Sequence, residues 1–249
     1  MADSLFLTTA DLGALALFVL AWGLHGLAAE GRLVSRISLS AAMDARREAW
    51  MRTMARRELR MIDTSIMVGL QQGTAFFASS SLIAIGGCFA LLGAPDNVIS
   101  VLADLPLTDT PSRRIFETKV IGLIVILSYS FFKFGWSYRL FNYCSILIGA
   151  VPMPMDGSGN DAEIDAATDR AARMNVLAGK HFNSGLRGIF FSLGYLGWFV
   201  GPTIFALTTL LLFGVLLRRQ FFSAARLAVV EERSTAGQGN GESIRPDSQ

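Results

Sequence analysis

The sequence predicts an all-α membrane protein: a four-transmembrane-helix bundle whose second, third and fourth helices extend on the cytoplasmic side. Only 17% of the 249 residues are charged and 52% are hydrophobic, whereas soluble domains carry about 25% charged residues. The apolar residues are gathered in long runs, as a helix that crosses a bilayer requires. The runs lack the alternation of lipid-facing strands, which excludes a transmembrane β-barrel.

Four segments are long enough to cross a membrane once, because a hydrocarbon core about 30 Å thick needs roughly 20 apolar residues of helix. We place the spans at about residues 10–29, 64–92, 118–140 and 192–217 of one helical domain, residues 1–233. The first span is expected to be retained, since a signal peptide begins with basic residues and this chain begins with Asp3 and Asp11. Residues 234–249 are rich in Gly and Ser, which predicts a disordered tail.

Lysine and arginine in the short loops predict the orientation, because cytoplasmic loops are enriched in them. Loop 30–63 holds eight and loop 152–187 holds four, against three between Arg113 and Lys119 and none before residue 10. We therefore place these two loops in the cytoplasm and the N-terminus outside, in the inner membrane of a bacterium. Five arginines follow residue 217. Placing the C-terminus outside as well leaves these five on the less basic side.

The apolar and amphipathic segments are longer than the membrane is thick. Trp136 lies in an aromatic run that is typical of the headgroup level, so Cys144–Val151 would continue the third helix into the cytoplasm. The uncharged run Gly188–Leu217 exceeds one span by about ten residues. Ahead of the second span, Ala41–Met61 is amphipathic. These extensions predict a helical knob on the cytoplasmic side.

Two pairs of glycines have the GxxxG spacing that lets helices approach closely in lipid: Gly69 with Gly73, and Gly197 with Gly201. We interpret both as helix-packing positions. The second predicted helix also carries polar residues on one face, among them Gln71, Thr74 and Ser81. Such a face either makes hydrogen bonds between helices or lines a path for a small solute, and the helix has no ionisable residue at mid-membrane.

A polar set lies at the cytoplasmic ends of the helices and is the candidate functional site. Arg139 with Asn142, and Asn183 with Arg187, share helix faces at spacings of three and four residues. Two guanidinium groups brought together need an opposite charge, which Glu30, Glu58 or Asp63 can supply, and Asp63 is the preferred partner. The alternative is a bound anion or lipid headgroup, because arginine suits phosphate geometry. The sequence thus predicts that Asp63, Arg139, Asn142, Asn183 and Arg187 converge on one site.

No constellation of catalytic residues or metal ligands stands out. The two histidines, His25 and His181, lie in no nucleophile or metal signature. Cys88 and Cys144 lie in apolar segments, where cysteine behaves as a small hydrophobe. No basic stripe interleaved with aromatic residues indicates nucleic acid. We therefore expect no catalytic residue, no metal and no cofactor.

Several segments together resemble an uncharacterised membrane family of bacteria and plants, the domain of unknown function 599. They are residues 73–81 (GTAFFASSS), 133–152 (KFGWSYRLFNYCSILIGAVP) and 181–187 (HFNSGLR), followed by Trp198 and Pro202. The likeness runs from about Leu12 to Phe221 and omits Pro154–Arg173. The resemblance implies a multi-helix membrane protein and supplies no activity. It picks out Arg139, Asn142, Asn183 and Arg187 as matching the family pattern.

Two functions remain open from the sequence. The first is a non-enzymatic scaffold or accessory subunit, whose partners are the lipid bilayer and either other membrane subunits or a second copy of the chain. The second is a small channel or transporter that uses the polar face of the second helix. In a transporter Gln71 and Ser81 would face a wet cavity, whereas in a scaffold they would be buried against a neighbouring helix.

Overall fold

The computed structural model describes residues 7–31, 33–34, 36–103, 112–153 and 160–230, and within them every regular element is a helix. The all-α fold class is therefore confirmed. The predicted tail, residues 234–249, lies outside the described residues. The helices are α1 (Thr9–Ala29), α2 (Leu39–Ala55), α3 (Met61–Gly93), α4 (Pro95–Ala103), α5 (Arg113–Gly149), α6 (Asp161–Tyr195), α7 (Gly197–Val200) and α8 (Pro202–Phe221), followed by a helical turn at residues 224–230.

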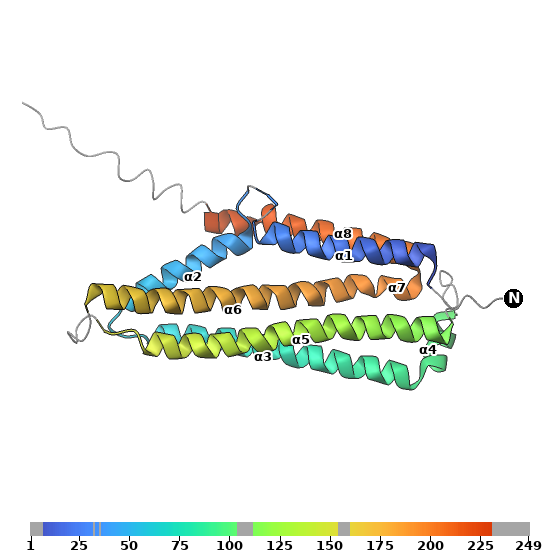
Figure 1. Cartoon of the computed structure of the whole chain (residues 1–249), viewed down its shortest axis with the longest axis horizontal. Coiled ribbons are helices and arrows are strands. Elements are labelled where there is room, and N and C mark those ends of the chain that lie inside the picture. Colours follow the sequence, from blue (N-terminus) through green and yellow to red (C-terminus); the bar gives the residue numbers. More distant parts are fainter. Residues whose placement is uncertain (1–6, 32, 35, 104–111, 154–159, 231–249) are drawn as a thin grey trace, which may run out of the picture.

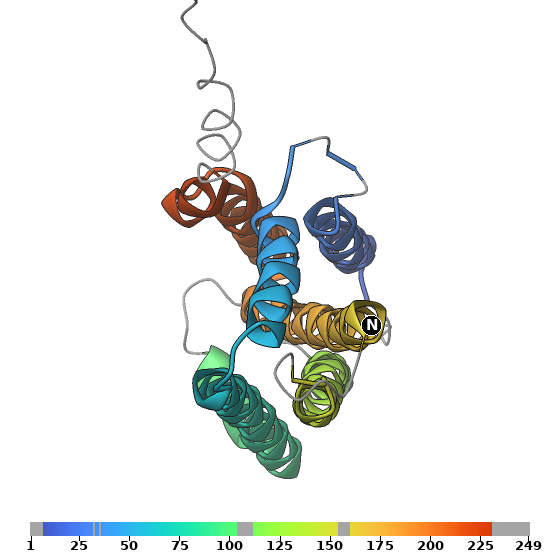
Figure 2. The same ribbon diagram turned by 90° about the vertical axis from the view of Figure 1, so that its left-hand side faces the viewer.

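The long helices lie side by side in three layers (Figure 1). In that view α1 and α8 form the upper layer, α6 runs through the middle, and α3 and α5 form the lower layer. Viewed along the bundle, α2 crosses between the layers at one end (Figure 2). We call this end, where α2 lies, the arginine-rich end, and the other, where α4 and α7 lie, the opposite end.

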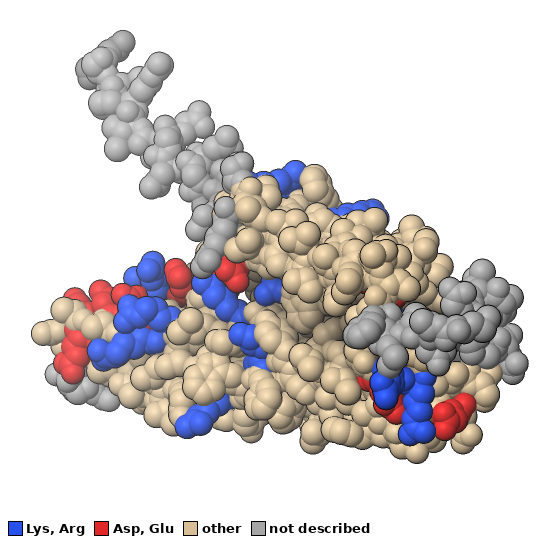
Figure 3. Space-filling model, turned by 45° about the vertical axis from the view of Figure 1, so that its right-hand side comes forward, with Lys and Arg blue, Asp and Glu red and all other residues tan. Residues whose placement is uncertain are grey.

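Four helices are long and apolar enough to cross a membrane: α1, α3, α5, and α8 with the residues that follow it to Val230. The space-filling view shows charged side chains gathered toward the two ends and a broad uncharged surface between them (Figure 3). At 33 and 37 residues, α3 and α5 are about 50 and 55 Å long. Both exceed a hydrocarbon core of about 30 Å. The chain is thus a helical membrane bundle whose two longest helices exceed the thickness of a hydrocarbon core.

The predicted loop at 152–187 is wrong for most of its length, and so is the single fourth span at 192–217. Residues 161–195 form one helix, α6, which packs antiparallel against α5 and reaches the opposite end. Ser137 Oγ donates to the carbonyl of Ala178 near the arginine-rich end, and the Tyr195 hydroxyl donates to the carbonyl of Lys119 near the other. A search for apolar runs missed this helix because its buried face consists largely of Ala and Gly.

The chain reverses between α6 and α8 because the helix cannot continue there. Pro202 has no N–H and its ring would clash with the carbonyl four residues earlier, and Gly201 is extended, with φ 167° and ψ 165°. A Cβ on Gly197 would lie 2.5 Å from Thr208 Oγ1, so only glycine lets the turn close against α8. Of the second GxxxG pair, Gly197 is therefore a packing position within the chain, while Gly201 has open space beside it.

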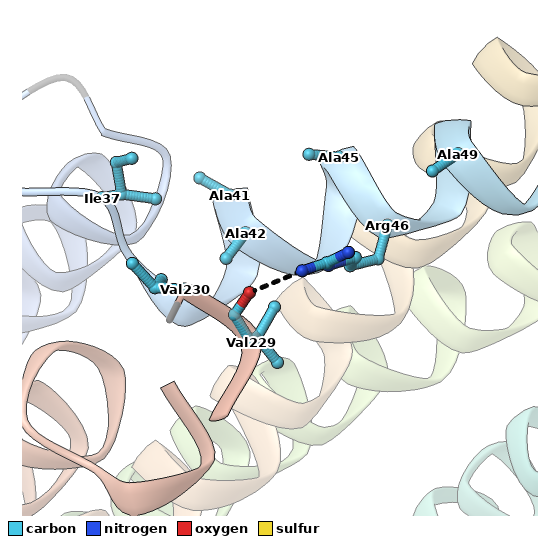
Figure 4. A pocket seen from close by; sticks show the side chains of 8 residues that line it. All are labelled: Ile37, Ala41, Ala42, Ala45, Arg46, Ala49, Val229 and Val230. Atoms are coloured by element: carbon cyan, nitrogen blue, oxygen red, sulfur yellow. Dashed lines mark hydrogen bonds between the residues drawn. The ribbon is translucent and has the colours of Figure 1, made fainter. Parts of the chain in front are cut away.

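This reversal brings the end of α8 back to the arginine-rich end, contrary to the placement of both termini on one side. Gln220 Nε2 donates to Ser40 Oγ at 2.6 Å, and Arg226 Nε donates to the carbonyl of Ile37 at 2.7 Å. Arg46 donates to the carbonyl of Val229 at 3.0 Å across a small pocket lined mostly by alanines of α2 (Figure 4). The described C-terminal residues and α2 thus lie at the same end.

Three buried residues, Asp11, Lys119 and Trp198, join the helices at the opposite end through hydrogen bonds, and we call them the polar lock. Trp198 Nε1 donates to Asp11 Oδ1 at 2.6 Å, and Asp11 also closes the capping box of α1 through Thr8. Lys119 Nζ donates to the carbonyl of Trp198 at 2.7 Å, and the side chains of Asp11 and Lys119 are both buried. Because each buried polar group has a partner, the lock joins α1, α5 and α7 without leaving a desolvated charge unpaired.

We expect Trp198→Phe to destabilise the bundle, because it leaves the buried Asp11 carboxylate without one of its donors. A hydrogen bond to a charged group is worth about 1.5–3 kcal/mol. Unfolding of the purified protein in mixed detergent micelles measures the loss. Trp136→Phe is the matched control, since Trp136 is half exposed on α5. Equal stability of the two variants would contradict the lock.

Candidate functional site

The five predicted site residues do not converge, and Asp63 is the clearest case. At the start of α3, Asp63 is fully buried and accepts hydrogen bonds from Arg57 Nη1 at 2.6 Å and Trp50 Nε1 at 2.7 Å. These donors lie at the end of α2 and in the turn that follows it. Asp63 is therefore neutralised locally, at the α2–α3 turn, and not by Arg139 or Arg187.

Arg139 and Arg187 point to different surroundings. Arg139 is exposed on α5, donates to the Tyr143 hydroxyl at 2.6 Å and lies over the rings of Trp136 and Tyr143. Arg187 on α6 lies against Gly26 of α1. Since Gly185 faces Phe134 and Gly188 faces Ser130, Arg187 is level with the stretch of α5 about two turns before Arg139. The predicted convergence of the two arginines is thus wrong.

Asn142 and Asn183 are also separated. The Asn142 carbonyl oxygen accepts from Gln71 Nε2 at 2.9 Å, and the same amide group of Gln71 donates to Ser145 Oγ at 3.2 Å. These bonds join α3 to α5. Asn183 is exposed on α6. The polar face of α3 is therefore used for packing, and Thr74 and Ser81 on that face are fully buried.

The structure reveals a polar junction in the knob that the sequence analysis missed. Arg47 of α2 donates to Asn175 Oδ1 of α6 at 2.6 Å and lies over the Phe141 ring of α5. Asn175 is fully buried and its amide nitrogen contacts Met67 Sδ of α3 at 3.7 Å. A Cβ on Gly179 would lie 2.8 Å from Arg47 Nε, so the glycine makes room for the guanidinium. Four helices meet at this junction.

The electrostatics of the knob follow from partial burial. Burial lowers the pKa of Arg47 and raises the pKa of its neighbour Asp44. Lys180 Nζ lies 4.0 Å from Asp44 Oδ2 and counteracts the rise. A guanidinium stays charged at any physiological pH, so the junction depends on the amide oxygen of Asn175 as an acceptor. The arrangement joins α2 to α6 and indicates a structural role for Arg47.

Arg60 holds the end of α5. Its guanidinium donates to the carbonyls of Ile148, Val151 and Pro152, at 3.1, 2.6 and 3.1 Å. The last carbonyls of a helix lack partners within it, and a cation there is favoured by the helix dipole. Like Arg47, Arg60 is one of eight basic residues in a single loop, and neither has a spacing that marks its partner in the sequence.

One polar group differs from all of these. His25 of α1 is buried, and neither of its ring nitrogens has a hydrogen-bond partner. Arg187 is a charged neighbour of His25, and its Nε is buried and unpartnered too. Of the residues that the structure describes, no group of three or more His, Cys, Asp or Glu is arranged to hold a metal ion.

The comparison with protein families identifies the chain. Residues 13–225 match the family described as "Protein of unknown function, DUF599". The chain belongs to this family. No curated protein and no solved structure matches it. The match runs from within α1 to beyond the end of α8, so the resemblance noted in the sequence is confirmed.

We expect Arg47→Met to destabilise this DUF599 protein by about 1–3 kcal/mol, because the buried oxygen of Asn175 loses its donor. Arg52→Met on the same helix is the matched control, since Arg52 is exposed. Thermal unfolding in detergent compares them. Reduced protection of the knob from proteolysis should accompany the loss. An Arg47→Met protein as stable as the control would show that the junction contributes nothing.

Proposed function

We propose that this DUF599 protein is a non-enzymatic scaffold or accessory subunit of the bacterial inner membrane, which docks a second transmembrane helix on the free side of α3. The observation that carries the proposal is the isolation of α3. It packs mainly against α5, with smaller contacts to α4, and stands at the outer edge of the bundle (Figure 2). Of its most apolar 18 residues, 11% are buried, against 39% for α5.

The free side of α3 is suited to helix contact as well as to lipid. Gly69 and Gly73 have no atom of the described chain within 4 Å of where a Cβ would be. This GxxxG pair therefore does not serve packing within the chain, although small residues at that spacing let two backbones approach closely in lipid. Ile66, Phe76 and Ile83 are exposed around it. An exposed close-approach surface on the least enclosed helix supports an intermolecular role.

The rival function, a solute path along the polar face of α3, has less support. In a transporter Gln71 and Ser81 would face water. Instead, Gln71 bonds to Asn142 and Ser145 of α5, and Ser81 is fully buried and donates to the carbonyl of Phe77. A hydrogen-bonded seam between two helices is the arrangement that a scaffold needs.

The proposed orientation places the arginine-rich end in the cytoplasm and the N-terminus outside. The return of α8 strengthens the charge bias, because Arg218, Arg219 and Arg226 now lie on the side that already held the more basic loops. Arg113, Arg114 and Lys119 are near the opposite end. By the positive-inside rule, the more basic end faces the cytoplasm.

Docking on α3 predicts that Gly69→Leu combined with Gly73→Leu abolishes association. Two leucines would hold an approaching backbone several ångströms away. Native mass spectrometry after gentle extraction measures the mass of the complex, and so separates a homo-oligomer from a complex with another subunit. The double variant should appear as the bare chain. Gly214→Leu on α8, which also has open space beside it, is the control. A double variant whose complex has the same mass as that of the wild type would contradict the proposal.

Cysteine labelling tests the orientation, in a background with Cys88→Ala and Cys144→Ala. In intact cells whose outer barrier admits the reagent, a membrane-impermeant maleimide should label Ser112→Cys, which is exposed at the opposite end. It should label Thr53→Cys and Ala225→Cys only after the inner membrane is opened. Labelling of Ala225→Cys in intact cells would overturn the placement of the C-terminal end.

A further inference from the structure

We propose that His25, Arg187 and Ser184 form a binding site for a phosphate group between α1 and α6. This site is separate from the free side of α3, so a test of phosphate binding does not depend on whether the scaffold function is correct. Both ring nitrogens of His25 and the Nε of Arg187 are buried and have no hydrogen-bond partner in the described chain.

His25 is the most deeply placed of the three residues. Its side chain is 7% exposed, and both ring nitrogens are buried without a hydrogen-bond partner. The ring of Phe191 lies 6.3 Å away, and the backbone of Leu216 in α8 is next to the imidazole. An unpaired polar group in such a setting costs about 1–3 kcal/mol. An acceptor oxygen from a ligand would remove that cost.

Arg187 supplies the charge. One of its terminal nitrogens donates to Ser184 Oγ at 3.3 Å, while its Nε is buried and makes no hydrogen bond. The salt bridges between described residues leave Arg187 without a carboxylate, and Asp63, the partner expected from the sequence, pairs with Arg57. The neighbouring charge is His25 itself, which would repel the guanidinium if protonated. The pair therefore attracts an anion and cannot neutralise itself.

The absence of a side chain at Gly26 lets the guanidinium lie directly against α1. Gly26 precedes the inner end of α1 by one turn, and a Cβ there would lie 3.4 Å from Arg187 Cζ, in van der Waals contact. A long side chain on a helix points toward the N-terminus of that helix. For α6 this direction is the arginine-rich end, so Arg187 reaches from the apolar zone toward the level where α1 ends.

A phosphate group fits these donors. Arginine offers two parallel N–H groups that match two phosphate oxygens, and a neutral imidazole and a hydroxyl each add one donor. The level of the site, at the inner end of a 21-residue span, is that of lipid headgroups. The phosphate could belong to an anionic lipid or be a soluble phosphate, and the same three side chains would bind either.

Binding to the full-length chain in mild detergent tests the site. Native mass spectrometry titrates dioleoylphosphatidylglycerol and dioleoylphosphatidylcholine, and calorimetry titrates inorganic phosphate. We expect the anionic lipid to bind at least tenfold tighter than the zwitterionic one if lipid is the source. Binding of inorganic phosphate without a lipid preference would support a soluble source. In either case Arg187→Gln should weaken binding about tenfold or more, which is 1.4 kcal/mol.

Matched variants separate the site from general electrostatics and from folding. Arg139→Gln removes one exposed positive charge at the same end and should leave binding unchanged. Gly26→Leu fills the space beside the guanidinium without changing charge and should reduce binding. Gly23→Leu, one turn earlier in open space, should not. The proposal is overturned if wild type binds none of the probes, if Arg187→Gln or Gly26→Leu binds as wild type does, or if Arg139→Gln loses as much.

Discussion

The close antiparallel seam between α5 and α6 is the contact on which the remainder of the bundle depends. A Cβ on Gly185 would lie 2.7 Å from the ring of Phe134, and Gly188 lies directly against Ser130. Such an approach gives extensive dispersion contact without side-chain entropy cost, which is the main source of helix association in lipid. The Phe134 ring in turn stacks on Phe77 of α3 at 5.5 Å between centroids. The seam therefore sets the positions of both α3 and α6.

The same seam explains how polar groups can be used in the knob. Because α6 continues beside α5 to the arginine-rich end, α2 can pack on its Ala-rich face. Met51 and Met54 of α2 are fully buried there, and Arg47 reaches Asn175. Each of these contacts requires that α6 be a helix through its whole length. If residues 161–180 were a loop, the buried methionines of α2 would have no partner surface.

The sequence predicts those helices that face lipid and misses the helix that is enclosed by others. Hydropathy identifies α1, α3 and α5, because lipid-facing positions must be apolar and these helices expose many of them. It does not identify α6, because that helix is enclosed by others. Its buried positions include Ala171, Ala178 and Gly179, which allow close packing but contribute little hydropathy. Gly201 and Pro202 indicate that a helix ends there. They lie within an uncharged run of 30 residues, however, and that length predicts one long helix.

The candidate site shows the same limit. Sequence position suggested that Arg139 and Arg187 lie at one level, but their heights and helix faces depend on the register of α5 against α6, which separates them by about two turns. That register is decided by Gly185 and Gly188, which carry no charge signal. The pairing of Arg57 with Asp63 was within reach, because six residues across a tight turn between two helices bring the side chains together. The junction of Arg47 with Asn175 joins residues 128 apart, and no local pattern predicts it.

Charge neutralisation distinguishes the arginines from one another. Arg57 has a buried carboxylate, Arg60 has three helix-terminal carbonyls, and Arg47 has a buried amide oxygen. In each case an oxygen of the chain offsets the cost of removing a guanidinium from water. Arg187 makes one hydrogen bond, at 3.3 Å to the Ser184 hydroxyl, and its buried Nε makes none. The Nε of Arg60 is buried without a partner as well, but three carbonyls accept from the other nitrogens of that guanidinium, whereas Arg187 makes one bond, to a hydroxyl; the proposed phosphate would supply the oxygens that Arg187 lacks.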